Sequence, residues 1–173
     1  LISIVNTLKA DLLYNQSRAQ TKKMELLQSA VNLQPNQPLF LAQLAEEEAK
    51  TSATIFLQLE SLPETAKAVQ DQLEKQALDH ATQAANMNQH NINLLKSKAR
   101  AEIYLSNIDP KYLKQALNTL LQASLLAPTD PKLLFNIGIL YQNLEKPDLA
   151  TKRFKKAVEL KPNYQEATHK LKP

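Results

Sequence analysis

Two basic residues one helical turn apart are the side chains best placed in this sequence to bind an anionic group. Lys96 and Arg100 are four positions apart, so on a helix both side chains leave the same face. Such a pair suits a carboxylate, because arginine donates two parallel hydrogen bonds while lysine adds a compact positive charge. Glu46 offers an internal alternative, since it is expected on the adjacent helix and would form an ion pair with Arg100. The sequence therefore supports two interpretations: a receptor for an acidic group of a partner, or an intramolecular ion pair.

Residue patterns that support catalysis or metal binding are missing from the sequence. The three histidines, His80, His90 and His169, lie far apart without ligand spacing, and the chain has no cysteine. The acidic run 46–48 is expected to be a solvated helix face. Serine and threonine residues lack histidine and aspartate partners in a recognisable order. We therefore predict no catalytic residue, no metal and no cofactor.

Residues 131–164 carry a pattern of two amphipathic helices with small residues where the helices would touch. Counted from Pro131, it occupies positions 4, 7 and 11 of a first helix and 20, 24 and 27 of a second, which are the spacings of one helix face. Gly138, the single glycine of the chain, stands at position 8, and Asp130 is placed to cap the first helix. The residues that define the pattern are Leu134, Ile137, Gly138, Tyr141, Ala150, Phe154, Ala157 and Pro162.

The second-helix part of this pattern recurs at the same spacing toward the N-terminus, at residues 116–128, 77–89 and 23–35. A unit of about 34 residues with these positions resembles the tetratricopeptide repeat (TPR) family. The resemblance implies one helical hairpin per repeat, with hairpins stacked into a superhelix that has a continuous core. The expected fold is therefore an all-α TPR solenoid.

We predict a single domain, residues 1–173, made of about four hairpins and a C-terminal capping helix. The second hairpin is longer than a standard repeat, with helices at about 39–60 and 62–88. Between these helices, Ser61 and Glu64 have the spacing of a capping box. The predicted repeats are about 4–37, 38–91, 92–130 and 131–164, and the predicted capping helix is 164–172.

Composition and charge restrict the class of partner. The chain has 173 residues, of which 43% are hydrophobic and 22% charged, and its net charge of +4 is mild for a helical repeat protein. The densest basic run, 152–156, surrounds an inward-facing Phe154, and no aromatic platform for stacking bases accompanies it. We therefore expect a protein or peptide partner and no nucleic acid.

The TPR resemblance implies that the first helices line a concave groove that binds the ligand. Lys96 and Arg100 stand where the carboxylate-clamp TPR domains place a basic pair. Other clamp positions hold Leu8, Leu12 and Glu46, so that clamp is largely missing. The groove residues implied by the resemblance are Leu8, Leu12, Asn15, Glu46, Asn93, Lys96, Arg100, Phe135, Ile139 and Gln142, and the same positions include Ala42, Ala49, Ile103 and Tyr104.

The function implied by the resemblance is that of a non-catalytic scaffold that binds a partner peptide or helix in this groove. One alternative rests on Lys9–Tyr14, which is similar to the region joining the membrane part of bacterial O-antigen ligase or polymerase-like proteins to a TPR tail. It would attach the chain to a membrane segment upstream of Leu1. Another alternative is a homodimer formed through the long hairpin 39–88. The chain is accordingly expected to be cytoplasmic or a soluble domain attached to a membrane.

Overall fold

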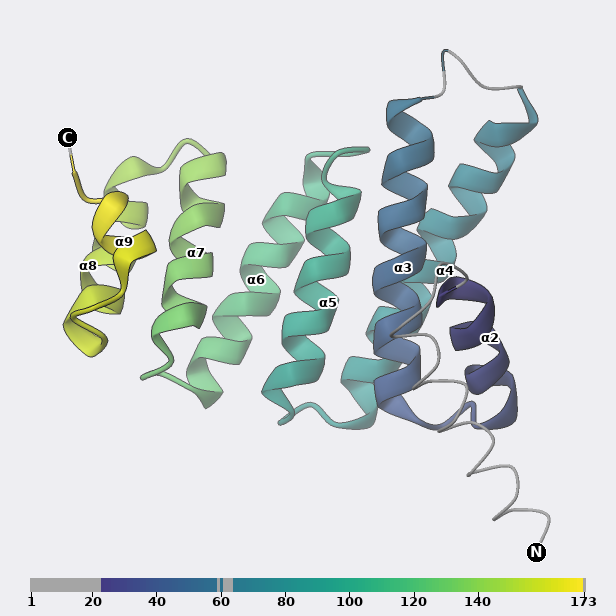
Figure 1. Cartoon of the computed structure of the whole chain (residues 1–173), viewed down its shortest axis with the longest axis horizontal. Coiled ribbons are helices and arrows are strands. Elements are labelled where there is room, and N and C mark those ends of the chain that lie inside the picture. Colours follow the sequence, from purple (N-terminus) through teal and green to yellow (C-terminus); the bar gives the residue numbers. More distant parts are fainter. Residues whose placement is uncertain (1–22, 59, 61–63, 173) are drawn as a thin grey trace, which may run out of the picture.

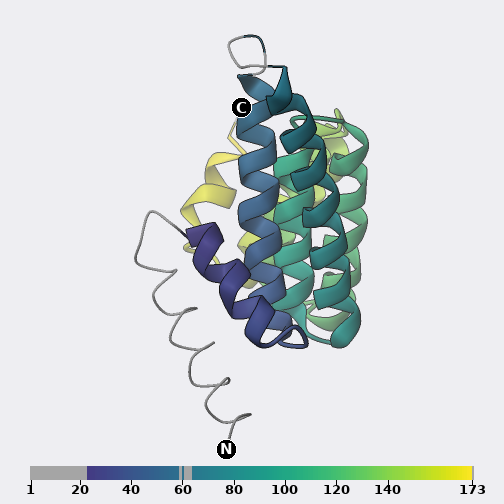
Figure 2. The same cartoon turned by 90° about the vertical axis from the view of Figure 1, so that its right-hand side faces the viewer.

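The computed structural model describes residues 23–58, 60 and 64–172, and the regular elements of these residues are eight α-helices with no β-strand (Figure 1). The helices alternate between two rows: α3, α5 and α7 form one, and α4, α6 and α8 form the other (Figures 1 and 2). This arrangement confirms the predicted all-α solenoid. The helices are α2 (Lys23–Leu33), α3 (Pro38–Leu57), α4 (Thr65–Met87), α5 (Ile92–Leu105), α6 (Lys111–Leu126), α7 (Pro131–Asn143), α8 (Pro147–Leu160) and α9 (Gln165–His169).

Small residues lie where helices of one hairpin touch. Ala77, Ala116 and Ala150, which open the second-helix pattern in α4, α6 and α8, are all buried. In α7, Gly138 faces the ring of Phe154 so closely that a Cβ atom there would lie 2.4 Å from Cε1 of the ring. The glycine is therefore required by the close approach of α7 and α8, since a larger side chain would overlap the ring.

The hairpin formed by α3 and α4 extends beyond its neighbours (Figure 1). α3 has 20 residues against 13 in α7, and α4 has 23 against 14 in α8. The predicted capping box falls largely on residues 61–63, which lie outside the described residues. α4 begins at Thr65, three residues later than the predicted position 62.

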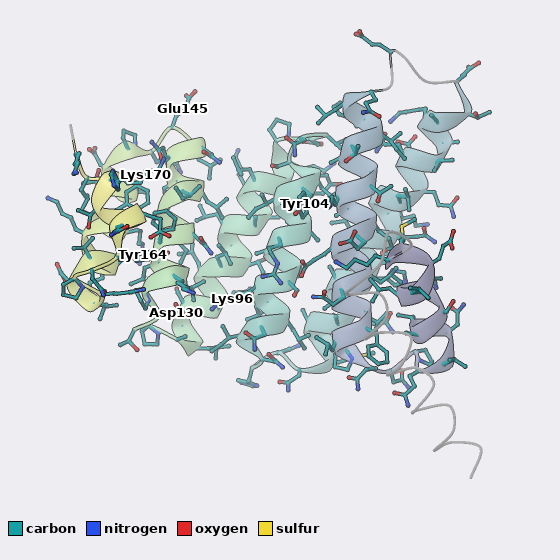
Figure 3. All side chains as sticks on the ribbon, in the orientation of Figure 1. Lys96, Tyr104, Asp130, Glu145, Tyr164 and Lys170 are labelled. Atoms are coloured by element: carbon teal, nitrogen blue, oxygen red, sulfur yellow. The ribbon has the colours of Figure 1, made fainter. Side chains whose placement is uncertain are left out.

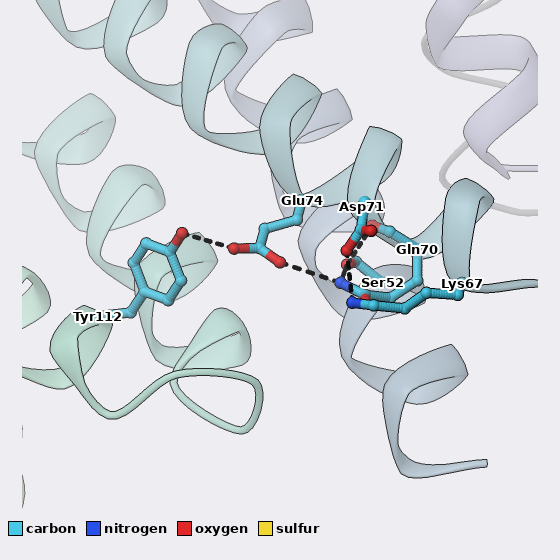
Figure 4. Close-up of polar contacts among 6 residues, drawn as sticks. All are labelled: Ser52, Lys67, Gln70, Asp71, Glu74 and Tyr112. Carbon is cyan, nitrogen blue, oxygen red and sulfur yellow. Dashed lines mark hydrogen bonds and ion pairs between the residues drawn. The ribbon is translucent and has the colours of Figure 1, made fainter. Parts of the chain in front are cut away.

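Buried polar side chains join the two arms of this hairpin (Figure 4). Ser52 and Gln70 are both fully buried, and the hydroxyl of Ser52 donates to the carbonyl of Gln70 at 2.9 Å. The Gln70 amide donates to Glu74 Oε2 at 3.0 Å, and the Tyr112 hydroxyl donates to Glu74 Oε1 at 2.6 Å. Because every member has a partner, the network fixes the register of α3 against α4 and links both to the start of α6.

The short helix α9 covers the C-terminal end of the stack. Tyr164, at its N-cap, and Ala167 are buried, whereas Gln165, Glu166 and Lys170 are exposed. A polar outer face of this kind is expected of a terminal cap. None of the described helices is both long and apolar enough to cross a membrane.

Candidate functional site

The first-helix face is the surface that α3, α5 and α7 present on the side away from α4, α6 and α8. Figure 3 shows Lys96, Tyr104 and Asp130 on this side of the molecule. Seven of the ten predicted groove residues belong to these three helices. The other three, Leu8, Leu12 and Asn15, lie outside the described residues.

Arg100 binds Glu46 across the boundary between α5 and α3. Its Nε donates to Glu46 Oε2 at 3.0 Å, and its Nη2 donates to Glu46 Oε1 at 2.7 Å and to Ser97 Oγ at 2.9 Å. The hydrogen bonds to Glu46 raise the pKa of the Arg100 guanidinium above its usual value. Its side chain nevertheless remains 49% exposed. The structure thus contains the intramolecular ion pair, and the guanidinium still reaches solvent.

Lys96 is held by the residue that caps the next first helix. Its Nζ lies 2.6 Å from Asp130 Oδ2, while Asp130 Oδ1 accepts the backbone N–H groups of Lys132 and Leu133 at 2.9 and 3.1 Å. Burial acts to raise the pKa of Asp130, but the hydrogen bonds from Lys96 and Leu133 outweigh it, so the pKa is lowered. The predicted N-cap is confirmed, and the same carboxylate ties α5 to α7.

The predicted residues of α7 lie close to the C-terminal cap. The ring of Phe135 packs against Phe154 and Tyr164, with ring centroids 5.6 and 5.2 Å apart. Gln142 accepts a hydrogen bond from Lys170 Nζ at 3.0 Å. Ile139, between them on the helix, is half-buried. The cap therefore engages two of these three side chains, and α5 offers the more open part of the face, including the exposed Asn93, Arg100 and Tyr104.

The resemblance implied that Ala42 and Ala49 line the groove, but the structure buries both. Ala42 is 1% exposed and Ala49 is fully buried. Ala42 packs in a cluster with residues of α2, and Ala49 packs in a cluster with Ala101 and Leu105 of α5. The physical reason is that α2 packs on α3 beside Ala42 and α5 packs on it beside Ala49, so both alanines are covered.

The expectation of a solvated acidic run is wrong at Glu48. Glu46 pairs with Arg100 and Glu47 with Lys23, but Glu48 is 2% exposed and its Oε2 lies 2.7 Å from His80 Nδ1. Burial raises the pKa of Glu48, and the hydrogen bond to Glu48 raises the pKa of His80. The long α4 places His80 opposite Glu48, and three neighbouring glutamates consequently have three different partners.

Comparison with solved structures shows the architecture to which this face belongs. A crystal structure of MamA protein is 13% identical with a TM-score of 0.65, covering 98% of this chain and 79% of its own. TTC0263, a thermophilic TPR protein from Thermus thermophilus, is 20% identical with a TM-score of 0.60, covering 98% and 79%. PilF from Pseudomonas aeruginosa is also 20% identical with a TM-score of 0.60, covering 98% and 66%.

The chain has the tetratricopeptide-repeat fold. No protein-family model matches its sequence, and no curated protein does. The structures reported above give no support to the resemblance to an O-antigen ligase tail. The segment that carried it, Lys9–Tyr14, lies outside the described residues. The low identities show the TPR fold alone, so the chemistry of the site has to be argued from this chain.

The TPR fold brings Arg100 together with Glu46, a pairing that the sequence offered as one of two interpretations. It also joins Lys96 to Asp130, which the sequence identified only as a helix cap. No group of three histidine, cysteine, aspartate or glutamate side chains that could hold a metal occurs within residues 23–58, 60 and 64–172. The arrangement on α5 is therefore suited to binding carboxylates through hydrogen bonds and charge.

Proposed function

We propose that this chain is a non-catalytic scaffold that binds an acidic peptide segment of a partner protein on its first-helix face, with Arg100 as the principal contact. The observation that carries the proposal is the bidentate hydrogen bonding of Arg100 to the carboxylate of Glu46. Glu46 occupies the position that a partner's carboxylate would take, and its geometry identifies the chemical group that the site accepts.

Arg100 retains the means to bind a second carboxylate. A guanidinium has five N–H donors, and the hydrogen bonds to Glu46 and Ser97 use Nε and Nη2. Among the described residues, none accepts a hydrogen bond from Nη1 of Arg100. Because the Arg100 side chain is 49% exposed, an incoming carboxylate can approach Nη1 and share the guanidinium with Glu46.

The surroundings of Arg100 suit an extended peptide. Tyr104, one turn further along α5, is 37% exposed and offers an aromatic surface. Asn93, at the other end of α5, is exposed and offers an amide for hydrogen bonding. A peptide that follows α5 would meet these three side chains in succession.

A peptide-display selection with four proteins tests the proposal. The wild type should enrich acidic peptides, and Lys96→Glu/Arg100→Glu should lose them. Glu46→Gln removes the internal competitor's charge and should strengthen binding of the same peptides. Lys155→Glu, an exposed charge reversal on α8, is the matched control and should behave as the wild type.

Enrichment of the same peptides by the wild type and the Lys96→Glu/Arg100→Glu variant would contradict the proposal. So would weaker binding by Glu46→Gln, because Glu46 would then be part of the binding site and not a competitor.

A second candidate function is self-association through the α3–α4 hairpin, and the exposed apolar residues near its end favour it. Leu57 is 70% exposed on α3 and Val69 is 49% exposed on α4. Large exposed apolar side chains on a projecting element are typical of contact surfaces. Light scattering over a concentration series should show a dimer that Leu57→Ser/Val69→Ser abolishes. A monomer at every concentration would exclude this candidate.

A further inference from the structure

We propose that the face opposite the first-helix face, which α4, α6 and α8 present, is a second docking surface, and that it binds an acidic amphipathic helix of a partner protein. This second-helix face is independent of the site around Arg100. The proposal rests on two adjoining cavities, on an exposed leucine between them and on the charges around them.

Two cavities lie on either side of α6. The first has a volume of about 630 Å³ and lies between α6 and α8, with Leu134 of α7 and Pro128 at its apolar base. The second has a volume of about 450 Å³ and lies between α4 and α6, with Leu95 of α5 contributing to its lining. Gln122 and Leu125 line both cavities, so the two adjoin along α6.

Leu125 forms an apolar ridge between the two cavities. Its side chain is 82% exposed, the highest value among the exposed large apolar residues of the described chain, and its neighbour Leu126 is 39% exposed. Single exposed leucines are common on protein surfaces. Here the leucine stands between a mainly apolar hollow and a second hollow in which Leu95 and Leu126 lie beside polar side chains. Such an arrangement allows a partner to bury the leucine while filling both hollows.

The charges around the cavities favour an acidic partner. Arg153 lines the first cavity and Lys98 lines the second, whereas no aspartate or glutamate is among the described residues that line either one. Within the described part of the chain, Arg153 forms no hydrogen bond or ion pair. This contrasts with Lys96 and Arg100 on the other face, which are both bound to carboxylates. Arg153 is thus available for a partner's carboxylate at the edge of an apolar hollow.

The spacing of the cavities matches the spacing of side chains on a helix. Because the cavities flank α6, they are separated by about one helix-packing distance, roughly 8–10 Å. Side chains at positions i and i+7 of an α-helix are about 10.5 Å apart along its axis. A helix lying across α6 would place one apolar side chain in each cavity and pack its intervening turn on Leu125. Glutamates beside the first apolar residue would reach Arg153.

A designed peptide provides the test. The probe is a fluorescein-labelled helical peptide of about 18 residues, long enough to form a helix, with leucines at i and i+7 and glutamates beside them. Its affinity for the full chain is measured by fluorescence anisotropy, and its location by chemical-shift changes in the ¹⁵N-labelled protein. Leu125→Ser and Arg153→Glu are the test variants. Leu149→Ser and Lys155→Glu are the matched controls, because both positions are exposed on α8 outside the two cavities.

The expected result is binding that Leu125→Ser and Arg153→Glu each weaken by about tenfold or more, as for an anchor residue, while each control changes affinity by less than about twofold. Shifted resonances should lie on α4, α6 and α8, and Arg100→Glu should bind the peptide as the wild type does. Circular dichroism of each variant confirms that it is folded.

Three results would overturn the proposal. The first is that the peptide fails to bind the wild type. The second is that the control variants weaken binding as much as the test variants, and the third is that the shifted resonances lie on α5 and α7. Two further measurements identify a different occupant and would also overturn it. The first is co-sedimentation with phosphatidylserine vesicles, and the second is a dimer in light scattering. Either counts against the proposal if Leu125→Ser abolishes it while the affinity for the peptide stays unchanged.

Discussion

Replacing Gly138 by alanine tests the closest helix contact in the structure. The added Cβ atom would lie 2.4 Å from Cε1, 2.7 Å from Cδ1 and 3.0 Å from Cζ of Phe154. The ring is 2% exposed and packs against Phe135 at 5.6 Å between centroids, so it has little room to turn away. We therefore expect Gly138→Ala to destabilise the protein, although alanine is the better helix former.

The magnitude follows from two opposing effects. Alanine in place of glycine inside a helix stabilises by about 1 kcal/mol. Forcing an extra carbon into a packed core costs about 1–3 kcal/mol, and contacts as short as these place the cost at the upper end. The net destabilisation should be about 1–2 kcal/mol, which corresponds to a fall in Tm of about 2–8 °C for a chain of this size.

Urea unfolding followed by circular dichroism measures this change, and a double-mutant cycle with Phe154→Leu assigns its cause. Leucine lacks the ring atoms Cε1 and Cζ, and its Cδ atoms can rotate away from position 138, so Gly138→Ala should cost markedly less in the Phe154→Leu background. The steric reasoning is refuted if Gly138→Ala raises the stability of the wild type, or if its effect is the same in both backgrounds.

Three further predictions concern titratable and capping groups. Burial, followed by the hydrogen bond to Glu74, raises the pKa of Tyr112 to about 12. The contribution of the protonated Tyr112 hydroxyl to the free energy of unfolding is therefore complete below pH 10 and is lost as the pH rises toward 12. The loss reaches at most about 3 kcal/mol. Tyr112→Phe should lack this alkaline slope in urea unfolding at pH 8, 10 and 11. The hydrogen bond to Glu48 raises the pKa of His80. The stabilisation by protonated His80 is therefore complete below its unfolded pKa of about 6.5 and declines as the pH rises through the raised value. His80→Gln should flatten the pH dependence of the unfolding free energy above about pH 6.5, and an unchanged slope would contradict this. Asp130→Ala should lower the free energy of unfolding by about 1 kcal/mol or more, because the helix loses its cap. Asp130→Asn should cost less, because the amide oxygen still accepts the backbone N–H groups. Equal losses on thermal unfolding would show that the charge and not the cap is responsible.

The positions of the helices were predictable because the repeat pattern records contacts within each hairpin. Ala116, Leu120 and Ala123 are buried in α6 as the corresponding residues are in α8, so one spacing was sufficient to place both helices. The extra length of the second hairpin was predictable for the same reason, since the pattern resumes at Ala77 after additional residues.

The ionic contacts were less predictable because they depend on how successive hairpins are oriented. Lys96 and Asp130 are 34 positions apart, and the contact exists only because the N-terminus of α7 lies beside α5. The burial of Glu48 likewise depends on His80, which is 32 positions away on the far arm of the long hairpin. Periodicity assigns a face to each residue of one helix, but it does not say which neighbour covers that face. The cavities beside Leu125 follow from the same inter-hairpin geometry.

The lengths of the hairpin arms show how one repeat of the solenoid can project beyond the others. α3 exceeds α5, which has 14 residues, by six residues, and α4 exceeds α6, which has 16, by seven. Six or seven residues are roughly two helical turns, so the two arms are longer by a similar amount. Ser52 on one arm and Gln70 on the other hydrogen-bond to each other. Because both arms are lengthened together, the longer hairpin can bury this polar contact between its own arms and does not depend on a neighbouring repeat for it.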